Sequence, residues 1–378
     1  MTTLNRTLER ADRAVKALSP GYFALVMATG IVSIGLTEAG FDWPGRALLV
    51  LAAIAYVVLA ALYSIRWFRY PAEVMSDLRN PEQAFGYFTI VAGTGVVATG
   101  LLDTALAIVS VALVVLAALL WFVLGYAIPW FVLMQRDGKP ILERTNGTWF
   151  VWSVASQSLA VGLAGIEPLV PSASVLIGML AVLSWSVGAL LYAGIAVLII
   201  LRIVHLGLTP EQFQPPYWVS MGALAISVVA GTGIVNMSAT PMVEAAASFI
   251  GGTVVSFWCF ASWLIPMLLG AGFWRHVLNG IPLRYSPGMW SMVFPLGMFA
   301  VASMRLGRVE RIPWIEVIGT SFLWIAVLAW LLVAAGLIGS VIRRGVDARE
   351  ARDARVKAPD AREASTSAAA DTPGGDHR

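Results

Sequence analysis

Charged residues are scarce in this 378-residue chain, at 12% against 58% hydrophobic residues. An ordinary soluble domain is about a quarter charged, so this sequence has too little polar surface to coat a water-soluble globule. Its hydrophobicity also excludes a disordered chain, which needs low hydrophobicity and high net charge. The mean hydropathy is +0.79, and at about 20 apolar residues per membrane span the chain has room for roughly ten spans. The sequence therefore predicts a polytopic membrane protein.

The side chains that carry most enzyme chemistry are also scarce. Cys259 is the one cysteine, which excludes a disulfide framework and a thiol-bound metal cluster. The sequence has no HExxH, CxxC, paired acidic motif or glycine-rich phosphate loop. The centres of the odd-numbered apolar runs hold no ionisable residue, which argues against a proton pump or a cation antiporter. We therefore predict no catalytic residue, no metal and no cofactor.

Ten apolar runs of helical length follow one another, so the expected fold class is all-α. The predicted spans are residues 20–39, 46–67, 85–103, 105–134, 147–166, 172–203, 216–238, 247–274, 287–304 and 313–342. They form one transport domain, residues 19–342. Residues 1–18 are predicted to be a cytoplasmic amphipathic segment, and residues 343–378, which contain no aromatic residue, a disordered cytoplasmic tail.

The charges of the loops predict the orientation. If the amino terminus, the loops after even-numbered spans and the tail share one side, that side holds 21 of the 25 Lys and Arg residues. The other side holds Arg46, Arg305, Arg308 and Arg311. The positive-inside bias then predicts a multi-pass plasma (inner) membrane protein with both termini in the cytoplasm. The net charge of +3 thus reports topology, and no nucleic-acid partner is predicted; the lipid bilayer is the expected partner.

A short pattern recurs at the starts of spans 1, 3 and 9. The three starts read SPGYFALVMATG from Ser19, AFGYFTIVAGTG from Ala84 and SPGMWSMVFPLG from Ser286. Spans 5 and 7 keep only an aromatic pair, which an interfacial aromatic belt also explains. The shared glycines favour five hairpins of like orientation. Such hairpins predict a ring of ten helices around a central pore, with the odd-numbered spans inside.

Small and hydroxyl residues concentrate in the odd-numbered spans, whereas the even-numbered spans are mostly large and apolar. Small residues let helices approach closely and can line a narrow polar passage, although a hydroxyl can instead bond to its own helical turn. The predicted pore-lining residues are Thr29, Gly30, Thr94, Gly95, Ser156, Gln157, Ser220 and Gly297.

Phe294 and Pro295 are the predicted gate. A proline inside a helix removes a backbone hydrogen bond and kinks the chain. A phenylalanine beside the kink can swing into a narrow axis and form a hydrophobic constriction. The alternative is an aromatic ring packed between helices beside a purely structural kink.

Three arginines depart from the positive-inside bias, Arg305, Arg308 and Arg311. On the outer face next to an inner helix, they could form a vestibule that raises the local concentration of anions. The alternative is a solvated loop in which they pair with Glu310 and Glu316.

Three strings resemble the tellurite-resistance/dicarboxylate transporter family, which includes fungal malate permeases, sulfite exporters and slow-type anion channels of plant guard cells. They are Pro20 to Gly30, Trp290 to Pro295, and Arg308 to Trp314. The resemblance covers about residues 19–342, although Ala28 stands where the family has a glycine. It implies five hairpins in a pseudo-fivefold ring, a homotrimer with one pore per subunit, and a ninth-helix phenylalanine, here Phe294, that occludes the pore.

The expected function is the passive passage of small inorganic anions or C4-dicarboxylates, such as malate, through a pore within each subunit. The first alternative is a proton-coupled carrier of dicarboxylate, sulfite or tellurite, in which the protonated substrate carries the proton. The second is a membrane enzyme that acts on lipid or isoprenoid substrates. The sequence does not select the anion.

Overall fold

The computed structural model describes residues 12–134 and 140–370, with only the backbone described for residues 344 and 346–370. All regular elements among these residues are helices. Residues 1–11 of the predicted amphipathic segment and residues 371–378 of the predicted tail lie outside the described residues. The chain divides into two compact units, Met1–Leu331 and Leu332–Arg378.

Ten helical stretches in the described part of the chain are long and apolar enough to cross a membrane. They are Pro20–Glu38, Asp42–Arg69, Ala84–Leu101, Ala107–Met134, Gly147–Leu169, Pro171–Leu206, Pro215–Val235, Pro241–Leu278, Pro287–Val309 and Pro313–Arg343. Each overlaps one predicted span. The predicted ten-span, all-α fold of a polytopic membrane protein is therefore confirmed.

The odd-numbered spans are buried and the even-numbered spans face outward. Buried residues make up 72–83% of the odd-numbered spans but only 6–28% of the even-numbered ones. The inner helices are α2 (Ala24–Glu38), α5 (Phe88–Leu101), α8 (Phe150–Ile166), α10 (Val219–Val235) and α12 (Trp290–Val309). Small residues are what allow these helices to pack closely on all sides.

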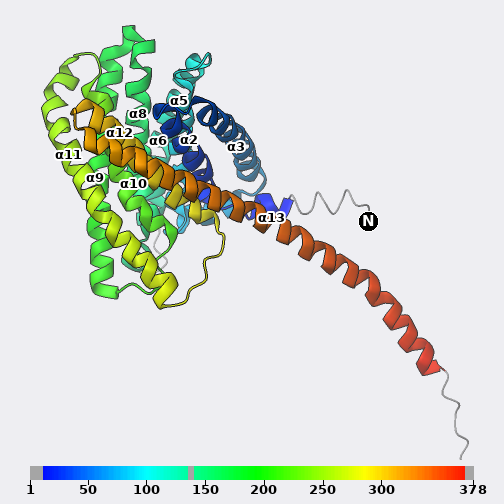
Figure 1. Cartoon of the computed structure of the whole chain (residues 1–378). Coiled ribbons are helices and arrows are strands. Elements are labelled where there is room, and N and C mark those ends of the chain that lie inside the picture. Colours follow the sequence, from blue (N-terminus) through cyan, green and yellow to red (C-terminus); the bar gives the residue numbers. More distant parts are fainter. Residues whose placement is uncertain (1–11, 135–139, 371–378) are drawn as a thin grey trace, which may run out of the picture. The chain divides into compact units, whose positions relative to one another are not determined.

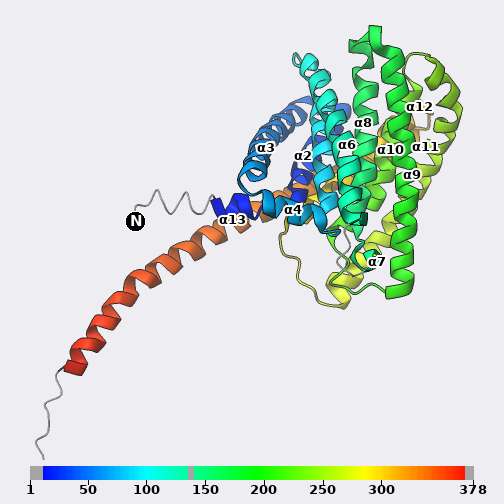
Figure 2. The same cartoon turned by 180° about the vertical axis from the view of Figure 1, so that it is seen from behind.

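Contacts between the inner helices form a closed cycle. α2 packs on α5, α5 on α8, α8 on α10, α10 on α12, and α12 returns to α2. In Figures 1 and 2 the outer helices α3 (Asp42–Arg69), α9 (Ser174–Leu206) and α11 (Pro241–Phe273) flank this group. An axial line between the inner helices is thus enclosed by protein.

Each outer helix completes a hairpin with the inner helix before it. α3, α6 (Ala107–Met134), α9 and α11 pack on α2, α5, α8 and α10 respectively. The fifth hairpin joins α12 to α13 (Pro313–Ala370): a Cβ atom on Gly319 would lie only 2.6 Å from the backbone nitrogen of Met304. Two short helices, α4 (Pro71–Arg79) and α7 (Ile141–Arg144), lie in loops between hairpins.

Every inner helix begins with a 3-10 turn. These turns are η1 (Pro20–Phe23), η2 (Ala84–Tyr87), η3 (Gly147–Trp149), η6 (Pro215–Trp218) and η8 (Pro287–Met289). They too contact one another in a closed cycle, in the order η1, η2, η3, η6, η8 and back to η1. The pattern that the sequence repeats at three starts therefore has a structural counterpart at all five.

Glycine makes this close approach of the turns possible. A Cβ atom on Gly86 would lie 3.0 Å from the backbone nitrogen of Gly21, and one on Gly147 would lie 2.5 Å from the carbonyl oxygen of Pro216. Both distances are shorter than ordinary van der Waals contacts. Larger residues at these positions would push neighbouring turns apart.

The carboxyl-terminal segment differs from the sequence prediction. Disorder was expected from residue 343, but α13 continues without a break to Ala370. Residues 343–370 are rich in alanine and arginine, which have high helix propensity. A segment of this composition can therefore be helical without burying an apolar face.

Candidate functional site: an axial path between five helices

A small cavity lies between the five inner helices. Its volume is about 20 Å³, which is close to the space that one water molecule needs. All five inner helices contribute to its lining: Ile31, Ile34, Gly95, Val96, Thr99, Ser158, Val161, Ile226, Val229, Met298, Val301 and Arg305. The axial path is therefore narrow at this level, and its wall is mostly apolar.

The polar groups of this wall are few and already bonded. Thr99 Oγ1 donates to the carbonyl oxygen of Gly95 at 2.9 Å, and Ser158 Oγ donates to the carbonyl oxygen of Ala92 at 3.3 Å. A Cβ atom on Gly95 would lie 2.2 Å from Ser158 Oγ, so glycine is what lets α5 approach α8 here. The wall offers weak, neutral polar contacts and no tight binding pocket.

Phe294 lies on the cavity-lining face of α12. It precedes Met298, Val301 and Arg305 by four, seven and eleven residues, spacings that place all four on one helical face. The Phe294 side chain is 1% exposed. The same spacing puts it on the η-turn side of the cavity.

Pro295 points instead at the neighbouring inner helix. A Cβ atom on Gly222 of α10 would lie 2.9 Å from Pro295 Cγ, so the proline ring fills the space that this glycine leaves. Because proline also lacks the backbone N–H of a normal helical turn, the backbone beside Phe294 has one hydrogen bond fewer.

Phe88 is a residue that the sequence analysis did not single out for the path. It precedes Gly95 and Thr99 of α5 by seven and eleven residues, and therefore shares their lining face. Its ring stacks on Trp152 of α8, with centroids 5.9 Å apart and planes 14° from parallel. The repeat at the span starts contains Phe88, but the pattern alone is equally typical of an interfacial aromatic belt.

Three of the predicted lining hydroxyls face outer helices. Thr29 Oγ1 accepts a hydrogen bond from Trp330 Nε1 of α13 at 3.0 Å, and Ser156 Oγ accepts one from Trp121 Nε1 of α6 at 2.8 Å. The Thr94 hydroxyl lies 3.1 Å from the hydroxyl oxygen of Tyr56 on α3. These side chains join inner helices to outer helices.

The other predicted lining residues, apart from Gly95, lie at further helix contacts or bond within their own helix. Gln157 Nε2 donates to the carbonyl oxygen of Trp185 on α9 at 3.0 Å, whereas Ser220 Oγ donates to the carbonyl oxygen of Tyr217, three residues earlier in the chain, at 2.8 Å. Gly30 packs against Val96, and Gly297 against Ile31. Gly95 is the member of the predicted set that lies among the cavity residues.

Two of the three predicted vestibule arginines pair with acidic side chains. The alternative pairing with Glu316 is present at Arg308, whereas Glu38 is a partner that the sequence analysis did not name. Arg305 donates through Nε and Nη2 to Glu38 Oε1, at 2.9 and 2.6 Å. Arg308 Nε donates to Glu316 Oε1 at 2.8 Å, and Arg308 Nη1 lies 3.6 Å from Glu38 Oε2. Arg311 is exposed and has a left-handed backbone, with φ of 55°. The charge of Arg305, at the end of the cavity, is therefore opposed by Glu38.

The opposite mouth is formed by the amino-terminal ends of five helices. Each helix carries about half a positive charge at this end, and all five inner helices begin here. Only the η3 turn has a side-chain cap among the five starts, from Asn146. The backbone N–H groups at these five helix starts therefore create a positive potential.

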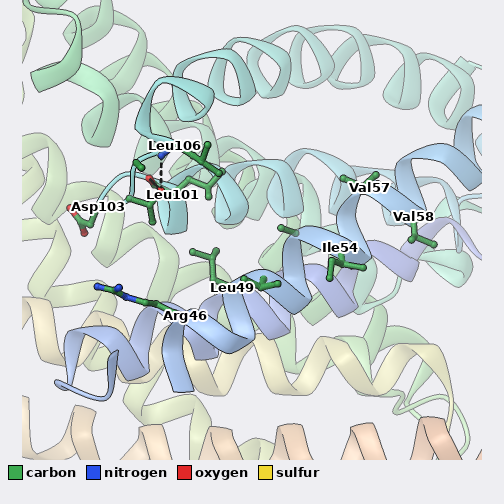
Figure 3. Close-up of a pocket in the computed structure, with 12 residues that line it drawn as sticks. Arg46, Leu49, Ile54, Val57, Val58, Leu101, Asp103 and Leu106 are labelled. Carbon is green, nitrogen blue, oxygen red and sulfur yellow. Dashed lines mark hydrogen bonds between the residues drawn. The ribbon is translucent and has the colours of Figure 1, made fainter. Parts of the chain in front are cut away.

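A larger cavity of about 790 Å³ lies outside the inner helices (Figure 3). It runs between α3 and the connection from α5 to α6, with Leu49, Ile54 and Val57 along it and Arg46 and Asp103 together at one end. Because its wall is almost wholly apolar and comes from outer surfaces, it is separate from the axial path.

The chain matches the sequence profile of a known protein family. The sequence profile of the voltage-dependent anion channels matches residues 17–338, which include all five hairpins. The chain belongs to the voltage-dependent anion channel family. This membership agrees with the resemblance to tellurite-resistance/dicarboxylate transporters and supports anion transport as the broad function. In the described part of this family member, no cluster of three or more His, Cys, Asp or Glu side chains is placed to hold a metal ion.

One relative matches part of this anion-channel family member, and two others match most of it. An uncharacterized membrane protein of Mycobacterium tuberculosis is 41% identical over 148 residues, which are 39% of this chain and 75% of the relative. An uncharacterized transporter of Methanocaldococcus jannaschii is 21% identical, over 84% of this chain and 92% of its own length. A sulfite efflux pump of Trichophyton rubrum is 22% identical, over 85% and 90% respectively.

Proposed function

We propose that this protein passes small anions passively along the axis enclosed by its five inner helices. The observation that carries the proposal is the cavity whose wall draws on all five of these helices. Its wall is mostly apolar, and its one charged side chain, Arg305, is paired with Glu38. Such a wall suits conduction, because a permeant ion must bind weakly enough to leave again. Selection for anions then comes from the positive ends of the five helices and from pore width.

Phe294 is the proposed gate of this path. Its ring is buried, lies on the lining face of α12 by helical spacing, and sits next to a proline-weakened turn. A cavity of about 20 Å³ is too small for a hydrated anion, so the described conformation corresponds to a closed path. We further propose a pseudo-fivefold arrangement of the hairpins and one such path in each subunit of a homotrimer.

The proposed membrane is the plasma (inner) membrane, with both termini in the cytoplasm. In this orientation the mouth formed by the η turns faces the cytoplasm, and the Arg305–Glu38 pair faces outward. The bias of 21 of 25 basic residues toward one side supports this assignment.

The choice of anion is a further proposal. The relatives include a sulfite efflux pump, so sulfite is the first anion to test, before malate, tellurite and chloride. Proton-coupled transport is the second candidate function. Since Arg305 is the one ionisable side chain of the cavity wall and is paired with Glu38, a proton would have to travel on the substrate. Membership of a family of transporters and channels favours passive passage and proton-coupled transport over a lipid-modifying enzyme.

The test is anion flux into proteoliposomes. Phe294→Ala should raise sulfite flux at least several-fold over wild type, because it removes the ring from the axis. Phe299→Ala is the matched control: Phe299 is equally buried on α12 but stacks on Trp258 of α11 and packs against Phe322 of α13. If the two variants conduct alike, Phe294 is not the gate. If flux stops without a pH gradient, passive passage is replaced by coupled transport.

A further inference from the structure

Two buried arginines occupy matching places in two hairpins. Arg66 lies near the end of outer helix α3 and Arg202 near the end of outer helix α9, and they are 4% and 6% exposed. Each donates through Nη1 to the tyrosine of the next 3-10 turn: Arg66 to Tyr87 at 2.9 Å and Arg202 to Tyr217 at 3.1 Å. The two sites therefore share one design, in which an outer-helix arginine reaches the start of an inner helix.

At the first site the charge of Arg66 is paired with a carboxylate. Arg66 Nη2 lies 2.6 Å from Asp77 Oδ2, and Arg66 Nε donates to the carbonyl oxygen of Lys16 at 3.2 Å. Asp77 comes from the short helix α4. Every edge of the Arg66 guanidinium thus has a partner, and one of these partners carries the opposite charge.

The second site lacks the counter-charge. Among the described residues Arg202 has no acidic partner, and its buried Nε has no hydrogen-bond partner. The connection from α9 to α10 has no counterpart of α4. Its one acidic residue, Glu211, is exposed. Arg275, in the short π-helix η7 (Trp274–Leu278), donates to the carbonyl oxygens of Pro210, Glu211 and Phe213.

The unused side of Arg202 is the edge that binds oxyanions. With Nη1 bonded to Tyr217, Nε and Nη2 remain, and these two N–H groups form the fork that bonds a carboxylate, sulfate or phosphate in bidentate fashion. A buried cation without a counter-ion is strongly unfavourable. The ring of Phe213 stacks on Tyr217 with centroids 5.4 Å apart, which shields the site from water and strengthens its electrostatic attraction.

We propose that Arg202 binds a small oxyanion through its Nε–Nη2 edge, beside the mouth where the inner helices begin. Tyr217 orients the guanidinium, and its own turn packs against Gly147 at the start of α8. The anion replaces the carboxylate that Asp77 supplies at the first site. Its source is either a free oxyanion or the phosphate of a lipid headgroup, since both present the same group to the fork. The site is distinct from the axial path, and its occupancy is measurable without transport.

The test is thermal unfolding of the delipidated, detergent-solubilised protein in Tris–chloride buffer, which contains no oxyanion, titrated with sodium sulfate and with inorganic phosphate. An anion that binds the folded state raises Tm in proportion to the logarithm of its concentration once that concentration exceeds Kd, whereas general salt exclusion raises Tm only at high salt and alike in every variant. Wild type should show a logarithmic rise of a few degrees at low anion concentration, and Arg202→Gln should lose it. Arg202→Lys, which keeps the charge but not the fork, should weaken the apparent affinity about tenfold or more.

The paired first site provides the controls. Arg66→Gln should keep the logarithmic rise from its own lower starting Tm, since Arg202 is intact. Asp77→Asn should add a second anion-dependent component, because it opens the Nη2 side of Arg66. If Arg202→Gln does not fold, Arg202→Lys and Tyr217→Phe carry the comparison, both with weaker anion affinity expected.

Native mass spectrometry with added phosphatidylglycerol separates the two sources. If the headgroup is the ligand, wild type retains one lipid more than Arg202→Gln and the lipid abolishes the response to phosphate. If the free anion is the ligand, lipid retention is equal and the response persists. The proposal is overturned if wild type shows neither a logarithmic rise of Tm at low anion concentration nor an additional lipid, or if Arg202→Gln responds as wild type does.

Discussion

Gly95→Ala tests the closest approach between two inner helices. The added methyl group would lie 2.2 Å from Ser158 Oγ and 3.2 Å from the backbone oxygen of Ser158. Overpacking of this kind costs about 1–3 kcal/mol, against a gain of about 0.5–1 kcal/mol for replacing glycine in a helix. Because a separation of 2.2 Å is far inside van der Waals contact, the upper end of this cost applies, and the net loss of about 2 kcal/mol should lower Tm by a few degrees.

The assay is thermal unfolding in detergent, with Gly125→Ala as the matched control. Gly125 lies on outer helix α6, where an added Cβ atom would meet nothing within 4 Å, so this variant should keep or slightly raise Tm. Adding Ser158→Ala to Gly95→Ala removes the worst contact and should recover about 1 kcal/mol or more. A Gly95→Ala protein as stable as the Gly125→Ala control would refute the reasoning, because α5 and α8 would then not pack as closely as described.

Two further predictions concern charged groups at the ends of the spans. Glu38→Gln removes a negative charge that pairs with Arg305 and Arg308. In the Phe294→Ala background, anion flux should therefore rise about twofold or more at low salt and approach that of Phe294→Ala alone at high salt. No change at low salt would mean that this mouth does not steer anions. Glu73 accepts a hydrogen bond from Lys16 that lowers the pKa of its carboxyl below the ordinary value, so this pair stabilises the protein above that ordinary pKa and the effect is lost as the pH falls through the lowered pKa. The Tm difference between wild type and Glu73→Gln should therefore shrink toward zero in acid, and a difference that does not change with pH would contradict it.

The spans and their division into inner and outer helices were predictable from the sequence, because hydropathy and the small residues that close packing needs are both local properties. The repeated starts were visible at three spans. Spans 5 and 7 have the same 3-10 turns with different residues, Gly147 and Pro216 among them. At these two starts the backbone has the same geometry as at the other three, but the side chains differ. A search for repeated residues therefore does not detect them.

The lining of the axis was harder to predict. Thr29, Thr94 and Ser156 have the composition of pore-lining residues, but their hydroxyls bond to side chains of outer helices, because a polar group in a membrane is stabilised by any helix that offers a partner. Arg305 was expected either to line a vestibule or to pair with Glu310 or Glu316, yet its partner is Glu38, 267 residues away in the chain. Pairings at such separations follow from the closure of α12 onto α2, which local spacing does not contain.

The central claim is that anions travel along the axis between the five inner helices, and modification of a single thiol tests it most directly. In a Cys259→Ser, Phe294→Ala background, Val229→Cys places the thiol in the cavity wall, while Val228→Cys places it one residue away on the same helix, outside that wall. A negatively charged thiol reagent should block anion flux through the Val229→Cys protein and leave the Val228→Cys protein conducting. Flux through Val229→Cys that persists after complete labelling, or equal block of both variants, would contradict an axial path.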